Sequence, residues 1–153
     1  IIKKLTLSLK LKNDIFVHRD FHVSNLMLVN NNIGIIDSQD ALIGNRAYDL
    51  ASLIDDVRLK TSNTLKKQIY KLYINRQKKL NKINFKNDFE ILSVLRNLKI
   101  IGIFTRLAVR DKKKNYLKLI PYAWSLIGNR INANKKFEDL KILLNQNFKG
   151  KIK

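Results

Sequence analysis

The chain lacks cysteine altogether and contains only two histidines among its 153 residues. Disulfide bonds and thiolate metal sites are therefore excluded, and a zinc site would have too few histidine and cysteine ligands. The five glycines are scattered, and no G-x-G-x-x-G loop occurs that could hold nucleotide phosphates. Because the absence of cysteine fits a reducing compartment, we expect a cytoplasmic protein.

Long apolar runs are also missing. No apolar stretch approaches the roughly 20 residues that span a bilayer, and the N-terminus lacks the apolar core and cleavage site of a secretory signal. We therefore expect no membrane partner. The chain begins with isoleucine rather than methionine, which we interpret as a fragment of a longer protein.

Acidic residues are scarce: 12 against 31 lysines and arginines, which gives a formal net charge of +19. The obvious partner of such a chain is a polyanion. Half of the acids, however, fall within residues 20–56, a region that a nucleic-acid binder would keep free of negative charge. Abundant lysine, asparagine and isoleucine indicate AT-rich codons instead. We favour composition bias over a functional basic face, and nucleic acid is the less favoured partner.

With 45% hydrophobic and 28% charged residues, the chain can bury a core, and its length suits one domain or one lobe. Residues 1–12 fit a helix or a strand, and we favour a helix that ends near residue 13. Two apolar runs, 26–29 and 33–37, flank asparagines that tolerate the positive φ of a hairpin turn. Beyond residue 46 the pattern predicts helices at about 48–60, 64–80, 87–109, 121–131 and 135–147, before a basic tail at 148–153.

The segment VHRDFHVSN (17–25) carries Asp20 and Asn25, and the second apolar run ends at Asp37. A hairpin would fold Asp37 back beside Asn25. A carboxylate that takes the proton of an alcohol, with hard oxygen ligands for Mg²⁺, is what phosphoryl transfer from a nucleotide needs. Asp and Asn are also common in loops because they satisfy local backbone groups. The whole string, HxDxxxxN followed by two strands and IID, is more specific than that alternative.

The segment VHRDFHVSNLMLVNNNIGIIDSQDALIGNRAYDLASL (17–53) resembles the aminoglycoside phosphotransferase family, whose fold is protein-kinase-like. The resemblance implies that Asp20 is the catalytic base and that ATP is the co-substrate. It also implies that Asn25 and Asp37 bind Mg²⁺.

The same resemblance gives roles to neighbouring polar residues. It implies that His18 and His22 support the catalytic loop through hydrogen bonds, and that Asp49, in YDLA, braces it. Asp40 follows Asp37 by three residues, so it can contact a second metal or the sugar, or cap the next turn. We include Asp40 among the candidate substrate-binding residues.

Residues 95–127 are similar to the helical region of bacterial anomeric kinases for N-acetylmuramate and N-acetylglucosamine, a subgroup that acts in peptidoglycan recycling. Arg106 and Arg110 lie one helical turn apart in this segment, and a guanidinium suits the carboxylate of N-acetylmuramate. Arginines on a basic helix are more often simply solvated. The subgroup usually has an aromatic residue after the metal aspartate, where this chain has Ser38.

We therefore expect an α+β, mostly helical fold over residues 1–153: the C-terminal lobe of a protein-kinase-like phosphotransferase, with a small β-hairpin that carries the catalytic loop. Only 17 residues precede His18, so the N-terminal nucleotide lobe is expected to be absent and the fragment inactive alone. The expected activity transfers the γ-phosphate of ATP to a sugar hydroxyl, the anomeric one of N-acetylmuramate or N-acetylglucosamine. Open alternatives are a kinase for another small alcohol (aminoglycoside, choline or homoserine) and a non-catalytic basic binding module.

Overall fold

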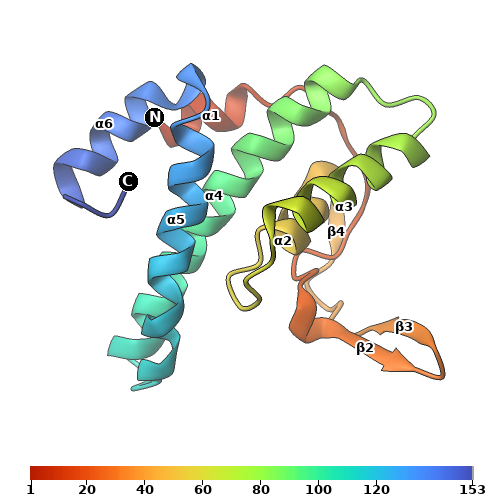
Figure 1. The fold of residues 1–153 in the computed structure, drawn as a ribbon, viewed down its shortest axis with the longest axis horizontal. Coiled ribbons are helices and arrows are strands. Elements are labelled where there is room, and N and C mark those ends of the chain that lie inside the picture. Colours follow the sequence, from red (N-terminus) through yellow and green to blue (C-terminus); the bar gives the residue numbers. More distant parts are fainter. Residues whose placement is uncertain (153) are drawn as a thin grey trace. The chain divides into compact units, whose positions relative to one another are not determined.

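The computed structural model describes residues 1–152, and the chain forms two compact units (Figure 1). One unit comprises residues 9–92, and the other comprises residues 1–8 with residues 93 onward. The fold is α+β and mostly helical, with two small antiparallel sheets, which confirms the predicted class. Within residues 1–152, no helix combines the length and the apolarity needed to cross a bilayer.

The unit of residues 9–92 contains the four strands and the first half of the longest helix. Its elements are β1 (Asn13–Val17), a 3-10 turn η1 (Val23–Asn25), β2 (Leu26–Val29), β3 (Asn32–Ile35), β4 (Leu42–Asn45), α2 (Ala47–Ile54), α3 (Asn63–Arg76) and the start of α4 (Lys82–Val109). The predicted hairpin is present: β2 and β3 pair antiparallel, with Leu26 opposite Ile35. Asn30 and Asn31 turn the chain with φ of 48° and 62°, in the left-handed region that asparagine tolerates.

The strand β4 was not predicted. It pairs antiparallel with β1, so that Phe16 lies opposite Ile43 and Val17 opposite Leu42. Gly44 allows this pairing, because a Cβ at that position would lie 3.2 Å from a methyl of Val17. The pairing places Asn45, just before α2, opposite Asn13 at the start of β1.

The helix α3 ends at Arg76 rather than near residue 80, and α6 (Glu138–Asn147) begins at Glu138 rather than near residue 135. At three further boundaries that differ from the prediction, a side chain binds the backbone. The first helix, α1 (Ile2–Leu7), ends early, and the backbone N–H groups of residues 10 and 11 donate to a carboxylate instead. The helix α2 ends at Ile54 rather than near residue 60, where Asp56 accepts the N–H of Arg58 at 3.0 Å. The helix α4 begins at residue 82, after Asn81 accepts the N–H of Asn84.

The core of the unit of residues 9–92 lies between α2, α3 and the first half of α4. Its fully buried members come from one face of each helix: Ala47, Leu50, Ala51, Ile54, Ile74, Phe85 and Phe89. Tyr73 stacks on Phe85 with ring centroids 5.3 Å apart, and Tyr70 meets Phe89 edge-on at 5.0 Å. Such aromatic pairs add to the stabilisation from area burial. The helix α2 is therefore held by packing on its inner face.

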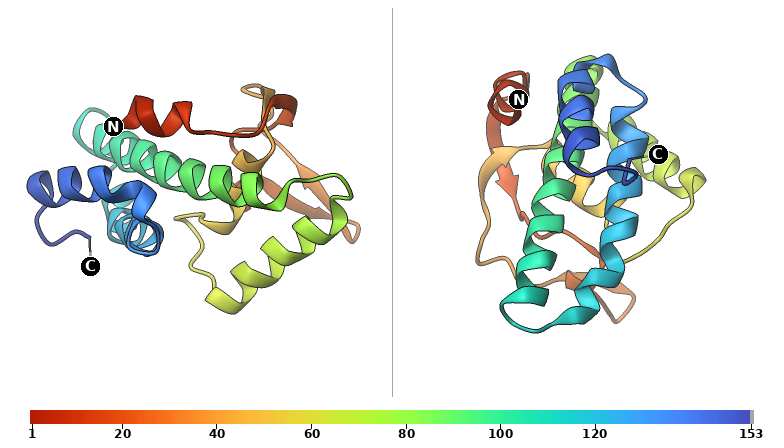
Figure 2. Two further views of the ribbon diagram at one scale, coloured as in Figure 1. Left: turned by 90° about the horizontal axis from the view of Figure 1, so that it is seen from above. Right: turned by 90° about the vertical axis from the view of Figure 1, so that its left-hand side faces the viewer.

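The other unit is a small helical bundle. Its elements are α1, the second half of α4, a 3-10 segment at Lys114–Leu119, α5 (Ile120–Ile131), a 3-10 turn at Lys135–Phe137 and α6 (Glu138–Asn147). Figure 2 shows α5 running beside the C-terminal half of α4. Trp124 is buried and contacts Phe148, with ring centroids 5.1 Å apart. Lys4 of α1 and Asp139 of α6 form an exposed ion pair at 2.8 Å.

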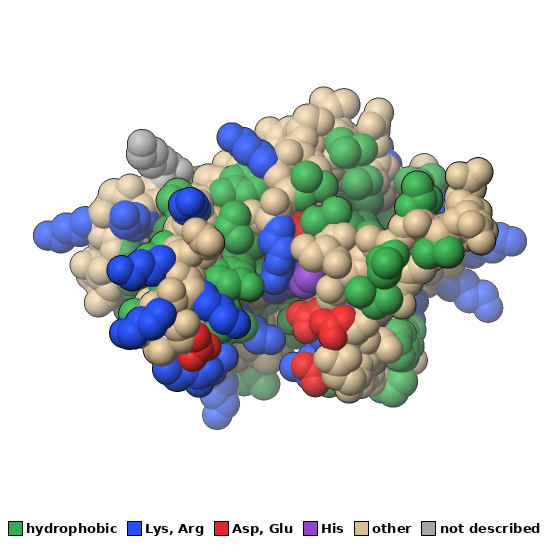
Figure 3. Space-filling model, turned by 90° about the horizontal axis from the view of Figure 1, so that it is seen from below, with side chains coloured by type: hydrophobic (Ala, Val, Ile, Leu, Met, Phe, Trp, Pro, Cys, Tyr) green, Lys and Arg blue, Asp and Glu red, His purple; other side chains and the backbone are tan. Residues whose placement is uncertain are grey.

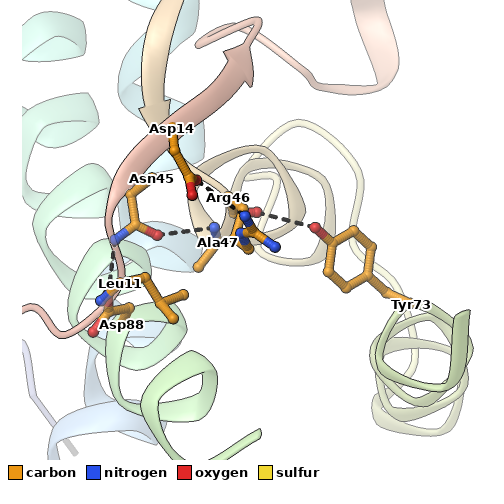
Figure 4. Close-up of polar contacts among 7 residues, drawn as sticks. All are labelled: Leu11, Asp14, Asn45, Arg46, Ala47, Tyr73 and Asp88. Carbon is orange, nitrogen blue, oxygen red and sulfur yellow. Dashed lines mark hydrogen bonds and ion pairs between the residues drawn. The ribbon is translucent and has the colours of Figure 1, made fainter. Parts of the chain in front are cut away.

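A buried carboxylate joins three segments of the unit of residues 9–92 (Figure 4). Asp88, on α4, is fully buried and accepts the backbone N–H groups of Lys10 and Leu11, both at 2.8 Å. It also accepts the amide Nδ2–H of Asn45 at 2.7 Å. The Oδ1 of Asn45 accepts the N–H of Ala47 at 3.0 Å, at the first residue of α2. The start of α2 is thereby fixed to α4 and to the chain before β1.

A residue of α3 also contacts the backbone just before α2. The phenol of Tyr73 donates to the carbonyl of Arg46 at 3.3 Å, and the Arg46 guanidinium pairs with Asp14 at 3.0 Å (Figure 4). Burial raises the pKa of the Tyr73 phenol above its ordinary value of 10.0; Arg46 opposes this shift and Asp49 adds to it.

The strands expose an extensive apolar surface. More than a third of the side-chain surface is exposed for large hydrophobic residues on all four strands: Phe16, Met27, Leu28, Val29, Ile33, Ile35, Leu42 and Ile43. Apolar patches of this kind mark interaction surfaces.

We expect Asp88→Ala to lower the free energy of unfolding by about 2–4 kcal/mol, because it leaves several N–H groups without their acceptor. Urea unfolding followed by circular dichroism measures this loss. The control Asp14→Ala removes a partly exposed ion pair and should cost less than about 1 kcal/mol. Equal losses in the two variants would contradict the anchoring function of Asp88.

The raised pKa of Tyr73 predicts a loss of stability in alkali. The folded state holds the phenolic proton more tightly than the unfolded state, so this contribution is complete below pH 10.0 and disappears as the pH rises through the higher folded value. The difference in unfolding free energy between the wild type and Tyr73→Phe should therefore shrink or reverse with rising pH. If the unfolding free energies of the wild type and Tyr73→Phe changed in parallel with pH, the predicted contribution of the Tyr73 proton would be refuted.

Candidate functional site

The hairpin brings the three central residues of the motif together. The Nδ2 of Asn25 donates to the backbone carbonyl of Asp20 at 3.0 Å and lies 3.4 Å from Oδ2 of Asp37. The backbone N–H of Ile36 donates to the carbonyl of Asn25 at 3.1 Å, which continues the contact between the two arms beyond the paired strands. One buried amide side chain therefore links the loop after β1 to the residue after β3.

Asp37 has a constrained conformation. Its φ is 69°, in the left-handed region, which is costly for a residue with a Cβ and occurs often at functional sites. The Nε2 of Gln39 donates to Oδ1 of Asp37 at 2.6 Å. Gln39 thus fixes the carboxylate in a segment where Ser38 offers no aromatic ring for packing, and the sequence analysis had missed this residue.

Asp49 holds the start of the loop. It lies in the first turn of α2, where the helix dipole favours an anion. Its Oδ2 accepts the N–H of His18 at 2.7 Å, and its Oδ1 accepts the N–H of Arg19 at 3.0 Å. Arg19 has a φ of 72°, so Asp49 stabilises a strained residue directly before Asp20.

The two histidines are buried beside this loop. His18 contacts the carbonyl of Ile36 through Nε2 at 3.0 Å, so it lies against the backbone immediately before Asp37. His22 precedes η1 and receives its backbone orientation from the Asp20 carbonyl, which accepts its N–H at 3.0 Å. The His18 ring thus contacts the segment before Asp37, while His22 makes a backbone hydrogen bond within the loop.

Asp56 holds the far end of the loop, and the sequence analysis gave it no role. It follows α2 and is buried. Its Oδ2 accepts the N–H of Val23 at 3.1 Å, while its Oδ1 accepts the N–H of Arg58 at 3.0 Å. In the sequence it was one of two adjacent aspartates inside a segment, 48–60, that was predicted to be helical, which gave no signal of its role.

The carboxylate of Asp20 is open to a reactant. It is half-buried, and it makes no hydrogen bond or ion pair with any residue in the described range 1–152. In the space-filling view, acidic side chains gather around a histidine and apolar side chains are exposed nearby (Figure 3). A carboxylate held by its backbone, with its side chain unengaged, can orient and deprotonate an alcohol.

The donor atoms of the cluster fit Mg²⁺. Because Nδ2 of Asn25 is directed at the Asp20 carbonyl, the amide oxygen is the atom left to act as a ligand. Asp37 adds a carboxylate, and Mg²⁺ needs few protein oxygens because it retains several waters. Within residues 1–152, no group of three or more His, Asp or Glu side chains lies close enough together to hold a metal ion, so a site here would use the Asn25 amide and water as well as Asp37.

The three candidate substrate-binding residues are exposed. Asp40 contributes its carbonyl to the Nη1 of Arg19 at 3.2 Å. Arg106 and Arg110 belong to the other unit. Arg110 forms a bidentate pair with Asp111 at 2.6 and 3.0 Å, which raises the pKa of Arg110 and lowers that of Asp111.

Known proteins resemble this chain in the segment that carries the loop and hairpin. A family model described as "Phosphotransferase enzyme family" matches residues 2–78, which include the whole loop and hairpin. Three relatives carry the name N-acetylmuramate/N-acetylglucosamine kinase. The protein from Caulobacter vibrioides is 32% identical over 115 residues, that from Neisseria meningitidis 38% over 116, and that from Pseudomonas aeruginosa 30% over 139.

These matches cover most of the chain but a minor part of each relative. They take in 72%, 70% and 85% of this chain, against 32%, 34% and 40% of the three relatives. The chain therefore spans only 32–40% of their length.

Proposed function

Because the chain belongs to the phosphotransferase enzyme family, we propose that it forms the catalytic and substrate-binding lobe of a kinase. In this proposal the γ-phosphate of ATP passes to an amino-sugar hydroxyl, the anomeric one of N-acetylmuramate or N-acetylglucosamine, in the cytoplasm. The relatives' names support this acceptor. The observation that carries the proposal is the Asn25 amide, which lies between the Asp20 carbonyl and the Asp37 carboxylate.

In the proposed reaction, Asp20 orients the acceptor hydroxyl and takes its proton. Asn25 and Asp37 are the residues that would hold Mg²⁺, and the bound ion would neutralise charge on the nucleotide phosphates. Asp49 keeps the loop in its strained shape, so that Asp20 is in place before the substrate arrives. Preorganisation of this kind means that little reorganisation is needed during the reaction.

The bare apolar surface of the strands supports the proposed division into lobes. Side chains such as Leu28 and Ile33, with 72% and 63% of their surface exposed, are costly to leave in water. A nucleotide lobe of the kind the family resemblance implies would cover part of this surface. Asp40, Arg106 and Arg110 remain the candidate contacts to the sugar.

The metal site can be tested on the chain itself with Mn²⁺ as a paramagnetic probe in place of Mg²⁺. We expect Mn²⁺ to broaden the amide signals around Asn25 and Asp37 first. Asp37→Asn should weaken this binding about tenfold or more, because it removes the anionic ligand. Asp139→Asn, which alters an exposed carboxylate of the other unit, should leave it unchanged. Broadening spread evenly over all exposed carboxylates would refute the site.

The base can be tested in a chimera that joins this chain to the N-terminal part of the Caulobacter relative. With ATP, Mg²⁺ and either amino sugar, Asp20→Asn should lower kcat by about 10²–10⁴-fold, with little change in KM or Mn²⁺ binding. The chain alone should turn over far more slowly than the chimera. Full turnover by Asp20→Asn would remove Asp20 from its role, and brisk turnover by the chain alone would contradict the lobe division. Aminoglycosides, choline and homoserine should be tested as alternative phosphate acceptors in the same assay.

A further inference from the structure

The loop between β1 and β2 is held at both ends by carboxylates from one short segment. Asp49, in the first turn of α2, binds the N–H groups of His18 and Arg19. Asp56, two residues beyond the end of α2, binds the N–H of Val23 at 3.1 Å. Asp49 lies inside α2 and Asp56 lies beyond its end, so the two acids contact the loop from opposite ends of one helix.

The contact of Asp56 satisfies a backbone group that has no local partner. Val23 is the first residue of η1, and the preceding residue, His22, supplies no side-chain cap. The N–H groups at the start of a helical turn need an acceptor from outside the turn. In most helices a Ser, Thr, Asp or Asn directly before the turn provides it. Here the acceptor is Asp56, 33 residues further along the chain.

The turn that Asp56 caps is the one that presents Asn25. The N–H of Asn25 donates to the carbonyl of His22 at 2.9 Å, which closes η1 as a single turn. Rotation of this turn would move the Asn25 amide away from Asp20 and Asp37. A cap on its first N–H therefore restricts the position of the amide at its end.

The two carboxylate oxygens of Asp56 bind different partners. Oδ1 binds the N–H of Arg58 at 3.0 Å and its Nη1 at 3.5 Å, which fixes the carboxylate on its own segment. Oδ2 is directed at the loop. The guanidinium of Arg58 also compensates the charge of a side chain that is only 3% exposed. The cap is thus a rigid, charge-assisted acceptor.

The segment that carries both acids is itself anchored. Asn45 fixes the start of α2 through Ala47, and the inner face of α2 is packed in the core. A rigid helix can transmit the position of one end of the loop to the other.

We infer that Asp56 is a positioning residue, which caps η1 and so fixes the amide of Asn25 next to Asp20 and Asp37. The inference rests on the proposed function only where it calls this amide a metal ligand. The hydrogen bond from Val23 to Asp56, and its effect on the turn, can be tested without any catalysis.

The experiment compares two isosteric replacements in the whole chain. Asp56→Asn keeps an oxygen that can accept the N–H of Val23, whereas Asp56→Leu fills the same volume without an acceptor. Amide hydrogen exchange followed by NMR should be about tenfold or more faster at Val23 and Asn25 in Asp56→Leu, relative to core amides, and nearly unchanged in Asp56→Asn. Equal protection of these amides in both variants would overturn the inference.

Asp88→Leu is the matched control, because it makes the same change at another buried carboxylate that binds backbone N–H groups. It should accelerate exchange at Lys10 and Leu11 far more than at Val23, which Asp88 reaches only indirectly, through Asn45 and α2. If Asp56→Leu does not fold, the chemical shift of the Val23 amide proton in Asp56→Asn provides the test. Because this variant replaces a charged acceptor with a neutral one, the Val23 signal should move upfield. An unchanged chemical shift would overturn the inference.

A Mn²⁺ titration of the same variants separates this inference from the proposed function. Broadening at Asn25 should weaken in Asp56→Leu and persist in Asp56→Asn. If the wild type shows no Mn²⁺ site, the proposed function fails, and the exchange data still decide whether Asp56 caps the turn. If Mn²⁺ binds all variants alike while exchange at Val23 changes, Asp56 does not position Asn25.

Discussion

The site depends on carboxylates that accept backbone N–H groups. Asp49 binds two N–H groups before Asp20, Asp56 binds one after it, and Asp88 binds two in the chain before β1. A buried carboxylate without such partners would be strongly destabilising. Each hydrogen bond therefore has two effects: the backbone N–H stabilises the buried carboxylate, and the carboxylate restricts the conformation of the backbone. A loop without regular hydrogen bonding acquires one defined shape in this way.

The sequence was sufficient to predict the hairpin, and the reason is local. Two apolar runs flank asparagines at 30 and 31, whose side chains tolerate the positive φ that a two-residue turn requires. The meeting of Asn25 with Asp37 then follows from antiparallel geometry. Fold class was predictable for the same reason, since helical periodicity after residue 46 is a local signal.

The features that the sequence did not predict are those decided at long range. From the sequence, Asp56 was one more acid in a segment predicted to be helical, and its partner Val23 is 33 residues away. Strand β4 contains a glycine and an asparagine, both poor strand formers, and it exists because β1 offers a pairing edge. The early end of α1 likewise depends on Asp88, 77 residues after Leu11. Periodicity carries no information on such contacts.

The strong positive charge makes the few acids informative. The chain has 12 acidic residues against 31 lysines and arginines. A bias toward lysine can act freely at exposed positions, because side-chain identity there has little effect on stability. Positions where a carboxylate binds backbone N–H groups cannot take lysine, because lysine has no acceptor. Asp49 and Asp56, at the two ends of α2, hold such positions by their contacts, whereas the carboxylate of Asp20 makes no hydrogen bond or ion pair with any residue of the described range.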